Sequence, residues 1–331
     1  MKKNILIAIV VAIVVVLAVS VFTLGKTTPA AKPVTDTTPA TQNPVVNQIF
    51  EYSTIDEVGY GVIGDAICYI DESKNIRLFT KNNGKTIKKL SFETARIISN
   101  GSSCLVDIIN ENDFNSFLLT QDLTIKQYEG VSTRPLLNSE NYQICSDENC
   151  FLIDSNGTTV KTFSVDNAYS TPDKNNAFFE ITGYNEEYIA GELLFVAGSK
   201  KTPVANIDRP ILSLHANKNM ALLSMESNQH SVSILTSAET GQKYTLSDVD
   251  PSSIAIAAEG FVYASKSGDI ADTNQANNIY QLTESGERRL ILGSNKNTED
   301  QIFNINNMVY NSKDGIIYWQ DAEKVFSIPF E

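Results

Sequence analysis

The strongest constraint on this chain is a repeat of short strand-like runs separated by tight polar turns. The stretch 220–246 holds three such runs, at Met220–Glu226, Ser231–Ser237 and Lys243–Leu246. An isolated hairpin of this kind is marginally stable in water, so each unit needs a neighbour to cover its apolar face. Stacked units would meet that need, and the pattern therefore favours a repeat architecture.

Two markers give the spacing of the repeat. Turns with glycine in second place recur at Asn83-Gly84, Asn156-Gly157, Thr240-Gly241 and Ser285-Gly286. Prolines recur at a similar interval, at Pro135, Pro172, Pro210 and Pro251. An interval of roughly 36–45 residues fits a four-stranded unit. We therefore predict an all-β fold, a seven-bladed β-propeller of four-stranded antiparallel blades; six or eight blades and an open β-solenoid are the alternatives.

The last repeat ends the chain without a fourth strand. A donor for that strand lies just before the first repeat, in the stretch 49–54, IFEYST. A ring closed by its own N-terminal strand leaves no exposed sheet edge at the junction. We expect this stretch to complete the last blade.

The N-terminal part of the chain differs in composition from the repeats. An apolar run at 5–24 follows Lys2 and Lys3, and about 20 such residues can cross a bilayer core as a helix. We predict a signal-anchor transmembrane segment at 1–26, with a cleaved signal peptide as the alternative. Residues 27–47 are rich in Thr and Pro and predict a disordered stalk. The propeller at 48–331 then lies outside the cell membrane, because the lysines precede the single span.

One turn carries a resemblance to a known family. The stretch 238–244, AETGQKY, resembles the repeat of pyrroloquinoline-quinone-type propellers of the quinoprotein-like superfamily, in which Thr-Gly precedes an aromatic residue. This resemblance implies a propeller over 48–331. The docking tryptophans of quinoproteins are missing, because Trp319 is the chain's single tryptophan. We therefore expect no quinone cofactor.

The four cysteines form two groups. Cys145 and Cys150 flank a short turn, where paired strands bring Cα atoms within disulfide reach, so they form a disulfide or two packed thiols. Cys68 and Cys104 occupy equivalent positions of neighbouring blades. Equivalent positions face the same way, so we expect two buried thiols that do not face each other.

Signals for catalysis are scarce. The two histidines, His215 and His230, lack metal-ligand spacing and are interpreted as ordinary surface residues, and no nucleophile elbow accompanies them. We therefore predict no catalytic residue, no metal site and no cofactor. The net charge of −13 disfavours nucleic acid as a partner.

The acidic residues are distributed unevenly over the predicted fold. The turns between second and third strands, together with the connection from the fifth to the sixth blade, carry an excess of them. We predict a binding surface on this face, formed by Glu111, Asp113, Glu186, Glu187, Asp248, Asp250, Asp269, Asp272 and Asn274. The expected function is a binding or scaffold module for an extracytoplasmic protein or envelope polymer, with a cationic partner favoured. A surface kept acidic for solubility is the alternative reading, and a propeller hydrolase or quinone-dependent oxidoreductase is the alternative function.

Overall fold

The structure is a computed structural model of the full sequence. It describes residues 31–37, 45–51, 59–80, 83–110, 113–132, 137–138, 141–146, 149–164, 170–172, 177–185, 190–217, 220–227, 231–257, 259–266, 276–293 and 305–330. Residues 32–331 belong to one compact unit.

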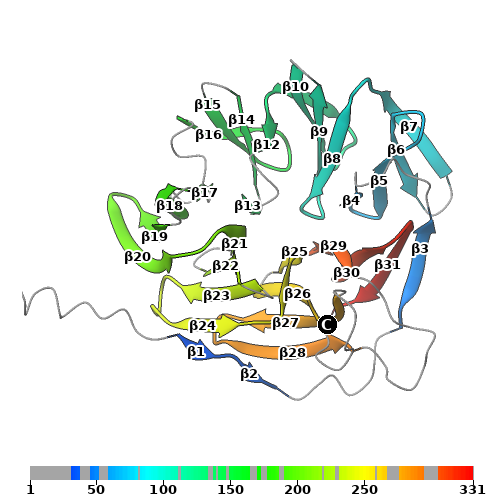
Figure 1. The fold of residues 1–331 in the computed structure, drawn as a ribbon. Coiled ribbons are helices and arrows are strands. Elements are labelled where there is room, and N and C mark those ends of the chain that lie inside the picture. The colour runs from blue at the N-terminus through cyan, green and yellow to red at the C-terminus, as the bar shows by residue number, and fades with distance from the viewer. Residues whose placement is uncertain are drawn as a thin grey trace, which may run out of the picture. The chain divides into compact units, whose positions relative to one another are not determined.

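The described strands form seven sheets, each built around four antiparallel strands (Figure 1). Blades 1 to 3, from the innermost strand outward, are β4 (Gly61–Ile63), β5 (Ala66–Ile70), β6 (Asn75–Thr80) and β7 (Asn83–Lys89); β8 (Thr94–Ser99), β9 (Cys104–Asn110), β10 (Asp113–Leu119) and β11 (Ile125–Glu129); and β12 (Val131–Ser132), β14 (Tyr142–Cys145), β15 (Asn149–Ile153) and β16 (Thr159–Ser164). Blades 4 and 5 are β17 (Ser170–Pro172), β18 (Ala177–Asn185), β19 (Ala190–Ala197) and β20 (Lys200–Ile207); and β21 (Ile211–Asn217), β22 (Met220–Glu226), β23 (Ser231–Ser237) and β24 (Lys243–Leu246). Blades 6 and 7 are β25 (Val249–Ala257), β26 (Gly260–Lys266), β27 (Ala276–Thr283) and β28 (Glu287–Leu292); and β29 (Asn306–Asn311), β30 (Ile316–Asp321), β31 (Lys324–Pro329) and β3 (Asn47–Glu51).

The seven blades form a closed ring, as predicted. Neighbouring blades contact each other through their strands, and β29 of blade 7 contacts β4 of blade 1. Between blades 3 and 4 the contact is made by the short strand β13 (Leu137–Asn138), which lies beside β17. The three runs that defined the repeat in the sequence coincide with β22, β23 and β24. The all-β propeller with four-stranded blades is therefore confirmed.

The N-terminal strand β3 closes the ring. It pairs antiparallel with β31, with Asn47 opposite Ser327 and Glu51 opposite Lys324. The predicted closing stretch 49–54 is thus confirmed in role, although the strand begins two residues earlier and the stretch beyond Glu51 lies outside the described residues.

The predicted transmembrane segment at 1–26 also lies outside the described residues. Among the residues that the structure describes, no helix is long and apolar enough to cross a bilayer. The anchor stays a prediction from the sequence.

Part of the predicted stalk is ordered instead of disordered. Within 27–47, β1 (Lys32–Pro33) pairs in parallel with β24, and β2 (Thr35–Asp36) pairs in parallel with β28 (Figure 1). The backbone N–H groups of Thr35 and Thr37 donate to the carbonyls of Gly286 and Arg288, both at 2.9 Å. The outer strands of blades 5 and 6 leave unpaired edge groups that an extended segment can satisfy, whatever its composition. We call residues 32–37 the strap.

The hydrophobic core is divided among the gaps between blades. Separate clusters of buried side chains fill the gaps between blades 1 and 2, 4 and 5, 5 and 6, and 6 and 7. Trp319 is fully buried in the last of these and stacks on Phe326 with ring centroids 5.7 Å apart. Each blade therefore buries its two faces only within the assembled ring, as a repeat fold requires.

Two of the glycine turns that marked the repeat receive an aromatic side chain from the preceding blade. A Cβ atom on Gly286 of blade 6 would collide with the ring of Tyr244 of blade 5. Gly157 of blade 3 has the same relation to Tyr128 of blade 2, whose hydroxyl donates to the Gly157 carbonyl at 2.9 Å. Both glycines also have positive φ, which a side chain disfavours. At these two turns the glycine is thus required by docking between blades as well as by the turn, whereas Gly241 has open space around it.

Candidate interaction face

The topology places two sets of loops on one face of the propeller. Strands alternate in direction within a blade, so the turns between second and third strands emerge at the same end as the connections between blades. We call this end the acidic face. Its described acids include Asp71, Glu72, Glu93, Asp113, Asp208, Glu226, Asp248, Asp250, Asp321 and Glu323.

Several of these acids hold the backbone of their own loops. Asp71 Oδ1 accepts hydrogen bonds from the backbone N–H groups of Ser73 and Asn75, at 3.0 and 2.9 Å. Asp250 Oδ1 accepts from the N–H and hydroxyl of Ser252, at 3.0 and 2.8 Å. Side-chain caps of this kind are the ordinary use of aspartate in turns. Asp250, a predicted binding residue, is therefore already engaged with its own loop.

Asp248, the second predicted residue that the structure describes fully, is part of a charge cluster. Its Oδ2 lies 2.7 Å from Nη1 of Arg288 in the next blade. The same guanidinium donates through Nε to Asp36 of the strap and lies 4.9 Å above the ring of Tyr280. The Tyr263 hydroxyl is 3.4 Å from Nη1. Arg288 therefore joins the strap, blade 6 and the connection that follows blade 5.

The pKa shifts of the cluster agree with this geometry. The hydrogen bond from Arg288 lowers the pKa of Asp36, although partial burial opposes the change. Burial by itself would lower the pKa of Arg288, but the bonds to Asp36 and Tyr263 raise it, and the net shift is upward. Burial raises the pKa of Tyr263. The cluster thus joins the Arg288 guanidinium to the side chains of Asp36 and Asp248.

The cluster predicts a specific effect on the strap. In Arg288→Met, amide exchange of residues 32–37 should accelerate by about 10-fold or more, because the ion pairs that hold the strap are lost and local opening becomes easier. Hydrogen-exchange mass spectrometry measures this directly, with blades 1 to 4 as an internal reference. Arg209→Met is the matched control, since the ion pair that Arg209 makes within the described part of the chain is with the adjacent and exposed Asp208, at 3.6 Å. Unchanged exchange in the Arg288 variant would show that the strap is held by its backbone pairing alone.

Of the remaining predicted residues of the face, the structure describes Asp113 alone. Asp113 begins β10 and pairs with Asn110, and nothing further is described for it. The others lie outside the described residues: Glu111, Glu186, Glu187, Asp269, Asp272 and Asn274. Whether the nine lie together is therefore not tested by the described residues, and their common surface stays a prediction.

A groove that the sequence did not indicate lies between blades 4 and 5. It encloses about 250 Å³. Its polar lining includes Asn206, Asp208, Arg209 and Lys243, beside apolar side chains such as Met225. Partial burial lowers the pKa of Lys243. No local sequence motif predicts this groove, because its two walls come from strands of different blades.

The described inner strands carry one buried titratable side chain that the sequence analysis had placed on the surface, His215. The short strand β13 (Leu137–Asn138), which follows β12 of blade 3, crosses to pair in parallel with β21 of blade 5. His215 on β21 is buried, so its interpretation as a surface residue is wrong. Burial lowers its pKa to about 4, although the Pro251 carbonyl partly opposes the shift. The described residues contain no group of three or more His, Cys, Asp or Glu side chains arranged to hold a metal ion.

The predicted cysteine pair lies at the end of the blade 3 hairpin. Cys145 and Cys150 are directly opposite in the register of β14 and β15, and the structure places a disulfide between them. Their Cα atoms are 4.0 Å apart. This link lies near the acidic face but belongs to a single hairpin, so it constrains one turn only.

Comparison with known proteins identifies the fold but no family. No protein-family model and no curated protein matches the chain. Among solved structures, it is similar to the β-propeller domain of the trilobed protease from Pyrococcus furiosus, with a TM-score of 0.54, 12% identity, and coverage of 85% of this chain and 96% of that domain. That domain is described as having an open velcro topology, whereas here β3 pairs with β31.

Two further structures give the same result. The WD40 β-propeller domain of Doa1 matches with a TM-score of 0.51 and 12% identity, over 87% of this chain and 98% of that one. An uncharacterised protein of Listeria monocytogenes EGD-e matches with a TM-score of 0.51 and 10% identity, over 81% and 91%. At these identities the likeness shows the β-propeller fold alone.

Proposed function

We propose that the protein is a membrane-tethered, extracytoplasmic binding or scaffold module that recognises a cationic protein or envelope polymer through its acidic face. The observation that carries the proposal is the convergence of turns and connections on one end of the closed ring. Exposed acids lie there on blades 1, 5 and 7, at Glu72, Glu226 and Glu323. Asp71 holds the loop that carries Glu72, and Asp248 and Asp250 lie on the connection from blade 5 to blade 6 of the same face.

Electrostatics supports a cationic partner. The chain carries a net charge of −13, and acids gathered on one face raise the local concentration of a cation near that face. Such a partner associates rapidly at low salt and more slowly once screening shortens the range to about 10 Å at 0.1 M. Binding of this kind needs no catalytic group, in keeping with the buried and neutral His215.

The proposed membrane tether is supported by the sequence. The apolar run at 5–24 with Lys2 and Lys3 before it supports a single span with the propeller outside the cell. The strap begins at Lys32, so only a short stretch separates the run from the ring.

The alternative is an extracytoplasmic enzyme, and the resemblance to pyrroloquinoline-quinone-type propellers supports it. Tyr244, the aromatic residue of that turn, docks on Gly286 of the next blade. This docking concerns the contact between blades rather than a reacting group. A binding module is therefore the better supported proposal.

The test is capture of the partner by the full chain in crosslinked membranes. The variant Glu111→Lys, Glu187→Lys and Asp272→Lys reverses three charges of the acidic face on blades 2, 4 and 6, and leaves the loop-forming Asp248 and Asp250 intact. We expect capture to fall by about 10-fold or more, and wild-type capture to weaken with salt. Omitting residues 1–26 should abolish sedimentation with membranes without abolishing capture.

The matched control makes the same change in charge on the opposite face. Asp65→Lys, Glu259→Lys and Glu287→Lys alter three exposed acids in the turns between first and second strands and at the start of β28. This variant should capture the partner as the wild type does. Equal retention by both variants, each still folded, would leave the acids as solubilising surface and reject the contact face.

A further inference from the structure

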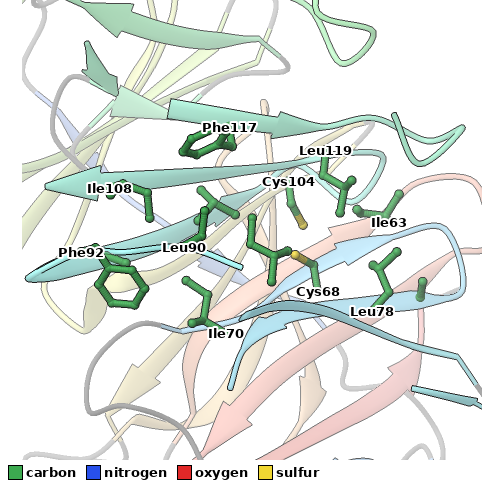
Figure 2. Close-up of a cluster of buried hydrophobic side chains, with 14 residues drawn as sticks. Ile63, Cys68, Ile70, Leu78, Leu90, Phe92, Cys104, Ile108, Phe117 and Leu119 are labelled. Carbon is green, nitrogen blue, oxygen red and sulfur yellow. The ribbon is translucent and has the colours of Figure 1, made fainter. Parts of the chain in front are cut away.

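Cys68 and Cys104 meet in the gap between blades 1 and 2. Both thiols are fully buried, and both belong to the hydrophobic cluster that fills this gap. Figure 2 shows their sulfur atoms directed toward each other from β5 and β9. The two side chains interact, and this contact adds to the effect of burial in raising the pKa of the Cys104 thiol. The prediction that they would not face each other is therefore wrong.

The difference arises from register. The turn between first and second strands covers 64–65 in blade 1 and 100–103 in blade 2. Counted from the middle of the turn, Cys104 therefore lies one residue closer to the turn than Cys68 does. Side chains alternate between the two faces of a strand, so an offset of one residue moves a side chain to the other face. Cys104 consequently faces blade 1 together with Val106 and Ile108, whereas Leu105 faces blade 3.

Gly61 creates the space for this contact. It lies opposite Cys68 in the register of β4 and β5. A Cβ atom on Gly61 would overlap the Cys104 sulfur and lie 3.1 Å from Cγ2 of Ile97. Packed sheets are usually about 10 Å apart, too far for a disulfide, which needs Cα atoms within about 7 Å. Because Gly61 has no side chain, blade 2 can approach blade 1 closely beside Cys68.

We propose that Cys68 and Cys104 form a disulfide that links blade 1 to blade 2 when the chain folds in an oxidising compartment. The oxidant is a disulfide compound, either a small molecule or an oxidoreductase. The thiolate of Cys68 attacks one sulfur of the oxidant and expels a thiolate, which takes up a proton. The Cys104 thiolate then attacks the mixed disulfide and expels the second thiol. Two protein thiols and one disulfide thus give one protein disulfide and two thiols.

Burial of the two thiols determines when the disulfide can form. Exchange requires a thiolate, and burial of Cys104 disfavours that form. The bond therefore forms while the two blades dock, or during local opening, and a chain folded without an oxidant keeps both thiols. The inference is independent of the partner and of the acidic face.

The experiment uses the full chain with Cys145→Ser and Cys150→Ser, which leaves Cys68 and Cys104 as its only cysteines. The protein is solubilised in detergent and refolded with a mixture of oxidised and reduced glutathione. Maleimide is added in denaturant before intact mass measurement. We expect no maleimide adduct in the oxidised monomer and two after reduction. The oxidised form should melt on the order of 5 °C above the reduced form, because a loop of about 37 residues is closed.

Two controls keep the inference open to rejection. The wild-type chain, refolded in the same way and digested without reduction, should yield a peptide that links Cys68 to Cys104, whether or not the variant folds. The variant oxidised in denaturant should give the bond in much lower yield. Two maleimide or glutathione adducts on a folded monomer, or links scrambled with Cys145 and Cys150, would overturn the proposal.

Discussion

Replacing residues 47–51 with a Gly/Ser stretch of equal length should destabilise the propeller by roughly 5 kcal/mol and promote aggregation. This replacement removes β3, the outer strand of blade 7, and leaves the edge of β31 unpaired. An exposed edge carrying Val325 and Phe326 is a template for association with another chain. Thermal unfolding and light scattering of the full chain would measure both effects.

The strap provides the matched control for this prediction. Replacing residues 32–36 in the same manner removes β1 and β2, which add to blades that already have four strands. We expect a loss of only about 1–2 kcal/mol, from a few edge hydrogen bonds and the ion pairs of Arg288. Equal melting of the two variants would contradict a specific role for β3 in closing the ring.

The repeat was predictable because its determinants are local in the sequence. Strand runs alternate with turns, and at two of the four marker turns, those of Gly157 and Gly286, an aromatic residue of the preceding blade docks on the glycine. Closure by the N-terminal strand followed from counting strands in the last blade. These features depend on spacing along the chain, which the sequence displays directly.

The predictions that were wrong concern features that depend on contacts between distant parts of the chain. The strap has the composition of a disordered spacer, and only the folded ring supplies the edges that it pairs with. The orientation of Cys104 depends on the length of one turn, which an alignment of blades can misplace by one residue. Counting charges likewise identifies an acidic face but does not show which acids are already engaged. Asp248, engaged by an arginine 40 positions further along the chain, is the clearest case.

These engaged acids affect how the candidate face should be studied. Asp248 joins the connection after blade 5 to the strap through Arg288, so its removal would disturb the fold and the binding surface together. Loss of binding in an Asp248 variant would therefore be ambiguous. The informative substitutions are those of exposed acids such as Glu226 and Glu323, because Asp71, in the turn between the second and third strands of blade 1, also holds its own loop.

The buried histidine gives the second large effect, a loss of stability in acid. His215 is 4% exposed, and its pKa falls from an ordinary value near 6.5 to about 4 in the folded protein. Between these values the unfolded chain binds a proton that the folded chain excludes, so the free energy of unfolding rises with pH across this window. A shift of this size corresponds to roughly 3 kcal/mol of stability that is present above about pH 6.5 and lost as the pH falls toward 4.

Denaturant unfolding of the wild type and of His215→Leu at pH 7.5 and pH 4.5 would isolate this contribution. Leucine cannot bind a proton, so the difference in unfolding free energy between the two pH values should shrink by about 2–3 kcal/mol relative to the wild type. The absolute stability at pH 7.5 is not the readout, because the substitution also changes packing against blade 6. His230→Leu, which alters the chain's other histidine, should leave the pH dependence of the wild type in place. The same slope in wild type and His215→Leu would mean that carboxylates, rather than His215, set the acid sensitivity of the ring.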